Sequence, residues 1–358
     1  MSLIDLRSDT VTLPTEEMYQ AMRSAELGDD GREGDPTVRK LEALAAAKTG
    51  KQAAVFVPSG TQANLISLLT HTGRGSEVLL HDAAHIIGYE NYGLAILGNL
   101  FYRPIPGKRG AMQLDVLEHA LESGLSAKGL APSLVCMETT HNTASGAVLP
   151  LEHMQKVYQL AKAHGANVHT DGARLFNAAV VLGIGADKIA QYTDSVCFCV
   201  SKGLSAPVGS LICGTTAFIE RARHFRRMVG GNMRQSGVVA AAGIVALEKM
   251  VDRLADDHRT ARKLAQGLQA IDASLVDAGA IESNILRIDV SASGVPAAQW
   301  CADLKQLGIW VADYGSVQIR LVTHRHIGEA EVEKAVSAMG TLWQRYGASA
   351  KKRSAVGA

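Results

Sequence analysis

The sequence lacks several features that would each define a class of protein. None of its apolar runs reaches the ~18 residues that a membrane-spanning helix needs. Its 36 lysines and arginines nearly balance 35 aspartates and glutamates, which leaves a formal net charge of +1 and no basic footprint for nucleic acid or anionic membrane. The N-terminal residues show no apolar segment typical of a signal peptide. We therefore expect a cytoplasmic protein with neither a nucleic-acid nor a membrane partner.

Cysteine is also scarce, and its odd number excludes a simple disulfide framework. The five cysteines have no framework spacing, which favours a reducing compartment. Cys197 and Cys199 would share one face of a strand, so a metal pair is one interpretation. The other is buried structural cysteine, which we favour because four of the five lie within or beside apolar runs. We predict no metal site.

The sequence does have length and a regular alternation of patterns. Its 358 residues permit one large domain and a smaller one, and 47% hydrophobic with 20% charged residues is typical of a globular protein. Helical and strand patterns alternate, which predicts an α/β fold with a largely parallel sheet. The strand candidates are nearly continuous apolar runs, as expected for strands covered on both faces. They comprise residues 53–57, 77–81, 133–138, 166–171, 195–200 and 210–213.

A second α/β pattern follows a long helical stretch that extends from about Met233 to about Ala270. We place the domain boundary inside that stretch, giving a large domain of residues 1–250 and a small C-terminal domain of residues 251–358. The basic, polar tail at 349–358 is expected to be disordered. The small domain is predicted to contain strands at 285–290, 309–312 and 317–321 and helices at 297–307 and from 329.

Lys202 follows the apolar run 195–201, at the carboxyl end of a strand candidate. Ligands of open α/β sheets bind at that edge. In dry surroundings a lysine has a lowered pKa, and its neutral amine can form a Schiff base. Position alone does not separate this role from that of an ordinary lysine at a strand end.

Asp171 closes the strand candidate before it, at residues 166–171. Pyridoxal phosphate needs a carboxylate against its pyridine nitrogen, because the protonated ring is the better electron sink. An aspartate and a lysine that each end a strand, about 30 residues apart, are a recurring arrangement for this cofactor. The alternative is that Asp171 caps a helix at 173–182.

Further candidates stand at strand ends and turns. Gly60 and Thr61 lie between a strand and a helix, where unpaired backbone N–H groups can bind a phosphate, although many such turns bind nothing. Arg320 faces away from the apolar side of its strand and suits an α-carboxylate, with a solvated edge arginine as the alternative. Arg174 is a candidate for a second carboxylate ligand. His85 and His141 could stack on a ring or transfer a proton, with ordinary surface histidines as the alternative.

Taken together, these motifs resemble those of the threonine aldolase family of fold type I pyridoxal-phosphate enzymes. The resemblance covers nearly the whole chain, from Asp5 to His324. Its specific stretches are Val-Pro-Ser-Gly-Thr at 57–61, Asp-Gly-Ala-Arg-Leu-Phe-Asn-Ala at 171–178, Ser-Lys-Gly-Leu-Ser-Ala-Pro-Val-Gly-Ser at 201–210 and Gly-Gly-Asn-Met-Arg-Gln at 230–235.

This resemblance implies a seven-stranded, mostly parallel sheet in the large domain and an active homotetramer, a dimer of dimers. The implied reaction is the reversible cleavage of an L-β-hydroxy-α-amino acid to glycine and an aldehyde. For the cofactor, the resemblance implies Lys202 as the Schiff-base lysine, Asp171 at the pyridine nitrogen, His85 against the ring, and Gly60, Thr61 and a neighbouring subunit's Arg234 at the phosphate. For the substrate, it implies His141 near the β-hydroxyl and Ser8, Arg174 and Arg320 at the carboxylate.

Three departures from the family pattern lie where the substrate side chain is expected. Arg32 replaces a tyrosine, Thr139 an asparagine and Ile87 another tyrosine. We hypothesise that Arg32 shifts preference toward an acidic or polar β-substituent, such as that of 3-hydroxyaspartate. The alternative is that Arg32 points to solvent. Other fold type I reactions, β-elimination or transamination, are the rival functions, and a non-catalytic binding protein is a third.

Overall fold

The computed structural model describes residues 3–123 and 132–356, with side chains as far as Tyr346. The chain divides into a larger unit, Leu13–Asp252, and a smaller one that joins Met1–Thr12 to Arg253–Ala358. None of the helices in the described parts of the chain is both long and apolar enough to cross a membrane.

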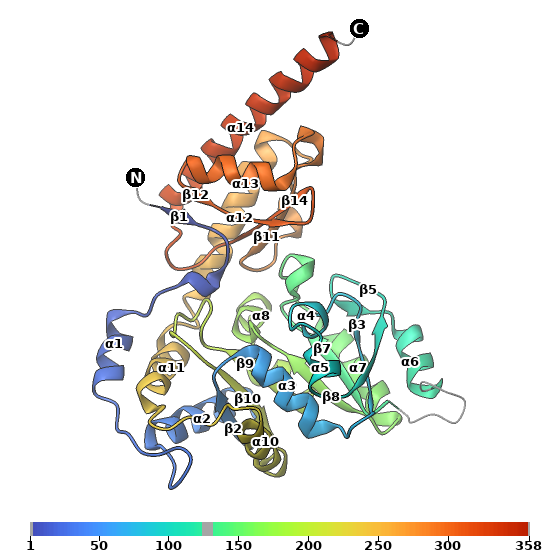
Figure 1. Cartoon of the computed structure of the whole chain (residues 1–358), viewed down its shortest axis with the longest axis vertical. Helices are drawn as coiled ribbons and strands as arrows, with labels where there is room; N and C mark the ends of the chain where they lie inside the picture. Colours follow the sequence, from blue (N-terminus) through green and yellow to red (C-terminus); the bar gives the residue numbers. More distant parts are fainter. Residues whose placement is uncertain (1–2, 124–131, 357–358) are drawn as a thin grey trace. The chain divides into compact units, whose positions relative to one another are not determined.

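The larger unit is built on a seven-stranded sheet of order β2-β10-β9-β8-β7-β3-β4 (Figure 1). Strand β10 is antiparallel to both of its neighbours, and the other pairs are parallel. The sheet therefore agrees with the expectation of seven mostly parallel strands. Its strands are β2 (Ala53–Val57), β3 (Glu77–His81), β4 (Phe101–Ile105), β7 (Leu134–Glu138), β8 (Asn167–Asp171), β9 (Ser195–Cys199) and β10 (Ser210–Gly214).

Six of these strands coincide closely with the sequence-predicted ones, and β4 was not predicted. It forms the edge of the sheet, where Phe101 is 59% exposed, so its sequence lacks the continuous apolar run of the inner strands. It also contains Pro104, which cannot donate a ladder hydrogen bond and is tolerated at an edge. An edge strand of this composition gives little local signal.

Helices flank the sheet, and several of them begin at clear capping signals. Asp35 accepts hydrogen bonds from the backbone N–H groups of Thr37 and Val38, with Pro36 at the first helical position. The helices are α1 (Glu16–Arg23), α2 (Pro36–Thr49), α3 (Gly60–His71), α4 (His85–Gly88), α5 (Gly93–Ile96), α6 (Leu114–Ser123), α7 (Leu151–Ala163), α8 (Leu175–Leu182), α9 (Ala186–Ala190), α10 (Thr216–Met228) and α11 (Gly237–Lys249); a short β5–β6 pair joins Gly107–Lys108 to Ala111–Met112.

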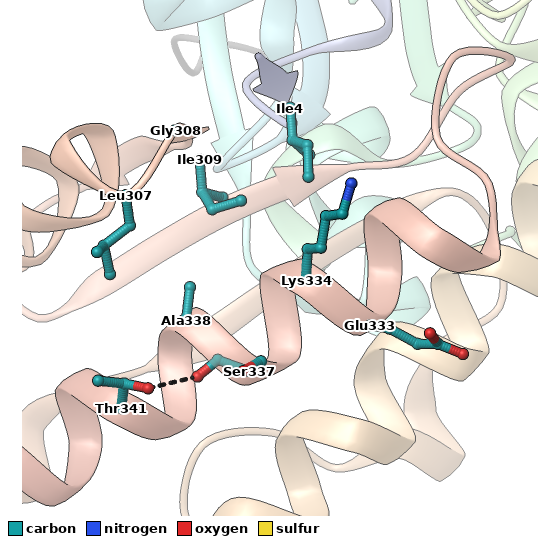
Figure 2. A pocket seen from close by; sticks show the side chains of 9 residues that line it. All are labelled: Ile4, Leu307, Gly308, Ile309, Glu333, Lys334, Ser337, Ala338 and Thr341. Atoms are coloured by element: carbon teal, nitrogen blue, oxygen red, sulfur yellow. Dashed lines mark hydrogen bonds between the residues drawn. The ribbon is translucent and has the colours of Figure 1, made fainter. Parts of the chain in front are cut away.

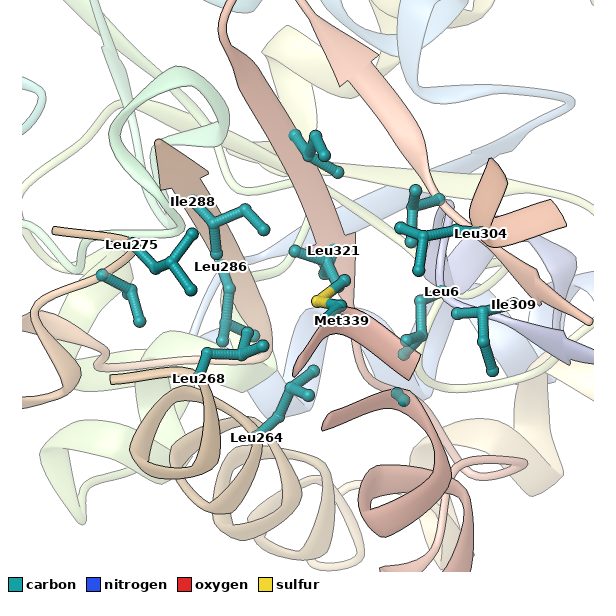
Figure 3. Close-up of a cluster of buried hydrophobic side chains, with 14 of the residues drawn as sticks. Leu6, Leu264, Leu268, Leu275, Leu286, Ile288, Leu304, Ile309, Leu321 and Met339 are labelled. Carbon is teal, nitrogen blue, oxygen red and sulfur yellow. The ribbon is translucent and has the colours of Figure 1, made fainter. Parts of the chain in front are cut away.

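The smaller unit contains a three-stranded antiparallel sheet of order β11-β14-β13 and a separate parallel pair, β1 with β12. An apolar cluster between this sheet and its helices includes the fully buried Leu6, Leu268 and Leu321 (Figure 3). Its elements are β1 (Ile4–Asp5), α12 (Leu254–Ile271), β11 (Ile285–Asp289), α13 (Ala297–Gln306), β12 (Ile309–Trp310), β13 (Ala312–Tyr314), β14 (Gln318–Val322) and α14 (Glu329–Val356).

Three details of the smaller unit differ from the sequence expectation. Helices α11 and α12 are separated by a turn, so the long helical stretch is two helices, and the smaller unit resumes along the chain at Arg253. The first twelve residues belong to this unit, because Ile4 pairs with Ile309 across more than three hundred positions of sequence. Helix α14 continues to Val356, where a disordered tail was expected, since the alanines and lysines there are good helix formers. Residues 357–358 lie outside the described residues.

A groove of about 620 Å³ lies on the smaller unit between α14 and the β1–β12 pair (Figure 2). Ile4, Ile309 and Ala338 give it an apolar lining, and Lys334 and Thr341 add polar groups. The Thr341 hydroxyl donates to the Ser337 carbonyl within α14. None of the residues that line this groove is a candidate site residue, so the site has to be sought elsewhere.

Candidate active site

The strand directions bring most candidate residues of the larger unit to one edge of the sheet. Because β10 is antiparallel to both β2 and β9, strand β2 runs parallel to β9, and so do β8, β7, β3 and β4. The carboxyl ends of these six strands therefore meet at the same edge. Gly60, His85, His141, Asp171 and Lys202 each end or follow one of them.

Asp171 ends β8 and is almost fully buried at 2% exposure. Its carboxylate accepts hydrogen bonds from the Ala173 backbone N–H (3.0 Å) and the Asn64 amide (2.9 Å). Burial raises the pKa of Asp171, but the charges of His85 and Lys202 and the Asn64 hydrogen bond outweigh burial, so the pKa lies below its ordinary value. The site thus holds a buried, ionised carboxylate with the positive charge of Lys202 close enough to stabilise it.

The alternative role for Asp171, as the cap of the next helix, is wrong. Helix α8 begins at Leu175 and is preceded by Arg174, and no side chain caps it by a hydrogen bond. The Asp171 carboxylate instead accepts from the turn at Ala173 and from a neighbouring helix. Its position is therefore set by the site and not by the start of α8.

His85 begins α4 and lies beside a second buried carboxylate. Its Nδ1 is 3.0 Å from Oε1 of Glu90, and its ring stacks parallel to that of Tyr89, with ring centroids 5.2 Å apart. Burial lowers the pKa of His85, whereas the hydrogen bond to Glu90 and the charge of Asp171 raise it, and the net result is a raised pKa. Burial also raises the pKa of Glu90, partly offset by its hydrogen bond to His85. The hydrogen bond to Glu90 thus fixes the orientation of the half-buried His85 imidazole.

Glu138 ends β7 and joins the two loops that carry the candidate histidines. Its carboxylate accepts the backbone N–H groups of His85 and Asn142, both at 2.7 Å. Burial, together with the charge of Asp171, raises the pKa of Glu138 to about 7. Fully buried His141 lies in the second loop, with Nε2 at 3.8 Å from the Glu138 carboxylate, and burial lowers its pKa to about 4. At neutral pH His141 is therefore an uncharged imidazole that can accept a proton.

The turn at Gly60 is shaped for a close approach to the backbone. Ser59 caps α3 by accepting the Gln62 N–H, while Gly60 and Thr61 occupy the first helical positions. A Cβ on Gly60 would lie 2.9 Å from Sγ of Cys199, so a larger residue would crowd the end of β9. The unpaired N–H groups of the helix start suit a phosphate, as predicted for this turn.

The candidate arginines differ in their surroundings. Arg174 follows closely after Asp171 in the sequence and is buried, with 7% of its surface exposed. Arg32 and Arg234 both lie next to Asp29, at 3.7 Å and 3.5 Å, and their side chains are 79% and 63% exposed. The structure thus leaves Arg234 free to be reached by another molecule and gives Arg32 no enclosed pocket within its own unit.

Ser8 and Arg320 belong to the smaller unit and lie close to one another there. Ser8 caps the short helix Asp9–Val11 by accepting the Thr10 N–H. Arg320 faces Arg287 across the β11–β14 pair and donates from Nη1 to the carbonyl of Arg7, the residue before Ser8. The predicted carboxylate ligands of this unit are therefore presented side by side.

Three residues of the site were missed by sequence reasoning. Glu90 follows a short helix with no strand end near it, and Glu138 closes the strand predicted at 133–138 but was not predicted as a site residue. Asn64 stands one helical turn after Gly60, and a polar residue at that spacing on a buried helix face was the available signal. The five cysteines, by contrast, are free and four of them are buried, as the structural interpretation predicted.

These residues fit pyridoxal phosphate by the chemistry of their donors. Lys202 offers an amine, Asp171 an ionised buried carboxylate, His85 an imidazole, and the start of α3 a glycine-lined turn that a Cβ would fill. His85, Glu90 and Asp171 also come within 4.8 Å of one another, a distance at which a metal could be bound. Because Asn64 already donates to both of these carboxylates, the trio is satisfied by hydrogen bonds from the protein.

The sequence model of the beta-eliminating lyase family matches residues 5–291. The chain therefore belongs to this family. Family membership confirms the predicted cofactor, pyridoxal phosphate, and the protein is a pyridoxal-phosphate-dependent lyase.

Individual relatives agree with the resemblance seen in the motifs. The chain is 45% identical to a probable low-specificity L-threonine aldolase 2 of Arabidopsis thaliana, over 93% of this chain and 95% of that protein. It is 39% identical to the low specificity L-threonine aldolase of Escherichia coli K12, over 94% and 98%. The solved structure of Leishmania major threonine aldolase shares its fold, with a TM-score of 0.80, 20% identity and coverage of 95% and 99%. The resemblance to threonine aldolases is confirmed.

Proposed function

We propose that the protein catalyses the reversible aldol cleavage of an L-β-hydroxy-α-amino acid, of the threonine or allo-threonine type, to glycine and an aldehyde. The observation that carries the proposal is the meeting of Lys202, Asp171, His85 and His141 at one sheet edge, in a chain closely related to threonine aldolases. No feature of the described residues favours β-elimination or transamination over this reaction, and these remain the rival outcomes of the test below.

In this proposal the Lys202 amine and the Asp171 carboxylate would hold the cofactor. Pyridoxal phosphate, when bound, withdraws electrons from a bond at the substrate Cα. Asp171 supports that withdrawal because its low pKa keeps it ionised beside a protonated nitrogen. His85 would contact the cofactor ring, and the start of α3, at Gly60 and Thr61, would hold the phosphate. Arg234 of a neighbouring subunit completes the phosphate site.

The substrate is oriented through its α-carboxylate. Arg174 in the larger unit is the proposed ligand, since a guanidinium binds a carboxylate through two parallel hydrogen bonds. Gripping the carboxylate fixes rotation about the N–Cα bond. The orientation of the Cα–Cβ bond is then set by the protein before that bond breaks.

The proton of the substrate β-hydroxyl is proposed to pass to His141. Its lowered pKa leaves it uncharged at neutral pH, and its Nε2 makes no hydrogen bond to any described residue. Glu138 stands 3.8 Å from that nitrogen and can stabilise the imidazolium once the proton arrives. The two groups together form a proton acceptor at the carboxyl end of β7.

The active form is proposed to be a homotetramer, a dimer of dimers, and the location to be the cytoplasm. Ile96, Leu97 and Phe101 are 74%, 69% and 59% exposed on consecutive elements of the larger unit, a patch that a second copy would cover. Five free cysteines agree with a reducing compartment.

The test is a product analysis. The holoenzyme is incubated with L-threonine, and glycine and acetaldehyde are quantified beside 2-oxo acid and ammonia, with Lys202→Ala as the control. Equal amounts of glycine and acetaldehyde, absent with Lys202→Ala, are the expected result. A 2-oxo acid and ammonia as the main products would replace this proposal with a β-eliminating lyase.

A further inference from the structure

The face of α3 that packs on the sheet carries polar residues where a packed helix normally carries apolar ones. Asn64, Ser67 and His71 stand at spacings of three and four, so they share one face of the helix. Helix α3 lies along β8 and β9 (Figure 1), and Asn64 and His71 reach groups on these two strands. Asn64 is 1% exposed. A buried amide at this position needs partners for all of its donors and acceptors.

Asn64 finds four partners. Its Nδ2 donates to Oε1 of Glu90 at 2.7 Å and to Oδ2 of Asp171 at 2.9 Å. Its Oδ1 accepts from Nε2 of His169 at 3.1 Å and from the Cys197 thiol at 3.2 Å. The Asn64 amide therefore links Asp171, the proposed partner of the cofactor nitrogen, to Glu90, the carboxylate that is hydrogen-bonded to His85.

The direction of this network follows from its chemistry. Ionised carboxylates only accept hydrogen bonds, so the Asn64 NH2 group must face Asp171 and Glu90 and its carbonyl must face His169. His169 then has to donate from Nε2, which leaves Nδ1 to accept from the Ser195 hydroxyl at 2.8 Å. The Ser195 oxygen in turn accepts a hydrogen bond from Nε2 of His71 at 2.7 Å. Every donor along the chain of contacts points toward the carboxylates.

Both histidines of the network are uncharged, as this direction requires. Burial lowers the pKa of His169 to about 4 and the pKa of His71 to about 3. Each ring therefore exists as the single tautomer that its neighbours select. Hydrogen bonds that all point the same way polarise one another, which strengthens the donors that reach Asp171.

We propose that Asn64, oriented by His169 and Ser195, is the positioning residue that sets the strength of cofactor binding, by holding Asp171 and Glu90 in place with one shared amide. The same helix offers its first N–H groups at Gly60, one turn before Asn64, so α3 contacts the phosphate site and the carboxylate site together. Asn64 acts through these carboxylates and touches no reacting atom. The inference rests on the roles proposed above for Asp171 and His85.

Asn64→Asp is the decisive variant, because it keeps the shape of the side chain and replaces both donors by an acceptor. A third carboxylate beside Asp171 and Glu90 repels them instead of holding them. We expect the dissociation constant of pyridoxal phosphate to rise at least about tenfold, as for loss of a hydrogen bond to a charged group. The pH midpoint of the visible absorbance of the bound cofactor should shift as well. Ser67→Ala is the matched control, since among the described residues the Ser67 hydroxyl, on the same helix face, bonds only to the Ala63 carbonyl.

A second pair of variants acts one step further from the cofactor. His169→Phe removes the donor that orients Asn64 and should raise the dissociation constant by a few-fold, about threefold. His169→Gln keeps a donor and should return the constant toward the wild-type value. This pair gives the answer where Asn64→Asp does not fold. A role in packing alone would predict the opposite order, because phenylalanine fills the site better than glutamine.

Both measurements are made without an amino-acid substrate, by titrating apoenzyme with pyridoxal phosphate and recording the absorbance of the holoenzyme from low to high pH. A failure of the aldol proposal therefore leaves them unaffected. The inference is overturned if folded Asn64→Asp matches Ser67→Ala in cofactor affinity and absorbance midpoint, or if His169→Phe and His169→Gln bind the cofactor equally well.

Discussion

In the smaller unit the buried positions next to the sheet are held by Leu6, Leu268 and Leu321, whereas at the carboxyl edge of the larger sheet they are held by Asn64 and Asp171. The first set packs without polar atoms, and its substitution leaves a cavity. Asn64 and Asp171 bury less apolar surface, but their hydrogen bonds hold the carboxylates of Asp171 and Glu90 in place at the carboxyl edge of the larger sheet. The difference predicts that substitutions in the two regions fail in different ways, the first in stability and the second in chemistry.

The largest effect on chemistry is expected for Asp171→Asn. Removing the ionised partner of the ring nitrogen should lower kcat by about 10²–10³, the range for loss of one preorganised electrostatic contact. The free energy of unfolding should fall by at most about 1–3 kcal/mol, because the amide keeps the shape of the side chain but turns its NH2 group toward one of the two N–H donors. Steady-state kinetics with L-threonine and a melting curve check both parts. Asp187→Asn, an exposed aspartate of the same unit, is the control and should behave as wild type.

The reciprocal effect is expected for Leu268→Ala in the apolar cluster. This fully buried side chain leaves a cavity when it is truncated, and the free energy of unfolding should fall by about 2–5 kcal/mol. Activity per folded molecule should stay near the wild-type value. Leu307→Ala, at a 44% exposed leucine of the same unit, should cost far less in denaturant unfolding. A stable Leu268→Ala protein with reduced kcat would break the contrast between the two regions.

A smaller and pH-dependent effect is expected for Glu138. Its pKa in the folded protein, about 7, lies above its ordinary value of 4.5, mainly because of burial. The stability contributed by the bound proton is therefore fully present below pH 4.5 and is lost as the pH rises through about 7.

Wild type should lose stability relative to Glu138→Gln between about pH 5 and about pH 8, because glutamine does not titrate in this range. Melting temperatures measured across this range for both proteins provide the comparison. Glu152→Gln, an exposed position, should show no such difference. Parallel curves for wild type and Glu138→Gln would mean that Glu138 keeps an ordinary pKa.

The smallest effect is expected at Arg32. The side chain is 79% exposed, so Arg32→Tyr should change the ratio of kcat/KM for 3-hydroxyaspartate over threonine by about fivefold at most, toward threonine, as for an exposed charge worth up to about 1 kcal/mol. Arg32→Lys should keep the wild-type ratio, because it retains the charge. An unchanged ratio in Arg32→Tyr would remove Arg32 from the determinants of specificity.

The inner strands of the larger sheet and the chemistry at their ends could be predicted because their signals are local. A continuous apolar run that closes on Asp171 or precedes Lys202 defines both the strand and the candidate. Strand β4 could not be found in this way, because Pro104 and partial exposure weaken its pattern. The place of the first twelve residues depends on the pairing of Ile4 with Ile309, which leaves no trace in the sequence around either residue.

The residues that support the site were harder to predict than those that do the chemistry. Glu90 and Glu138 act through the backbone or ring of His85, contacts that only the folded chain brings together. In the sequence Asn64 is one polar residue within a helix. Its role becomes visible only in the structure, where its side chain has four hydrogen-bond partners. Spacing can identify a residue by its own chemistry, but the pairing of buried polar groups is a property of tertiary structure.

The most direct test of the central claim is to trap the lysine that binds the cofactor. The holoenzyme is reduced with borohydride, digested and mapped by mass spectrometry for the stable pyridoxyl group. The account predicts one modified peptide, with the group on Lys202, and none in Lys202→Ala. Modification of a different lysine, or equal labelling of Lys202→Ala, would contradict it.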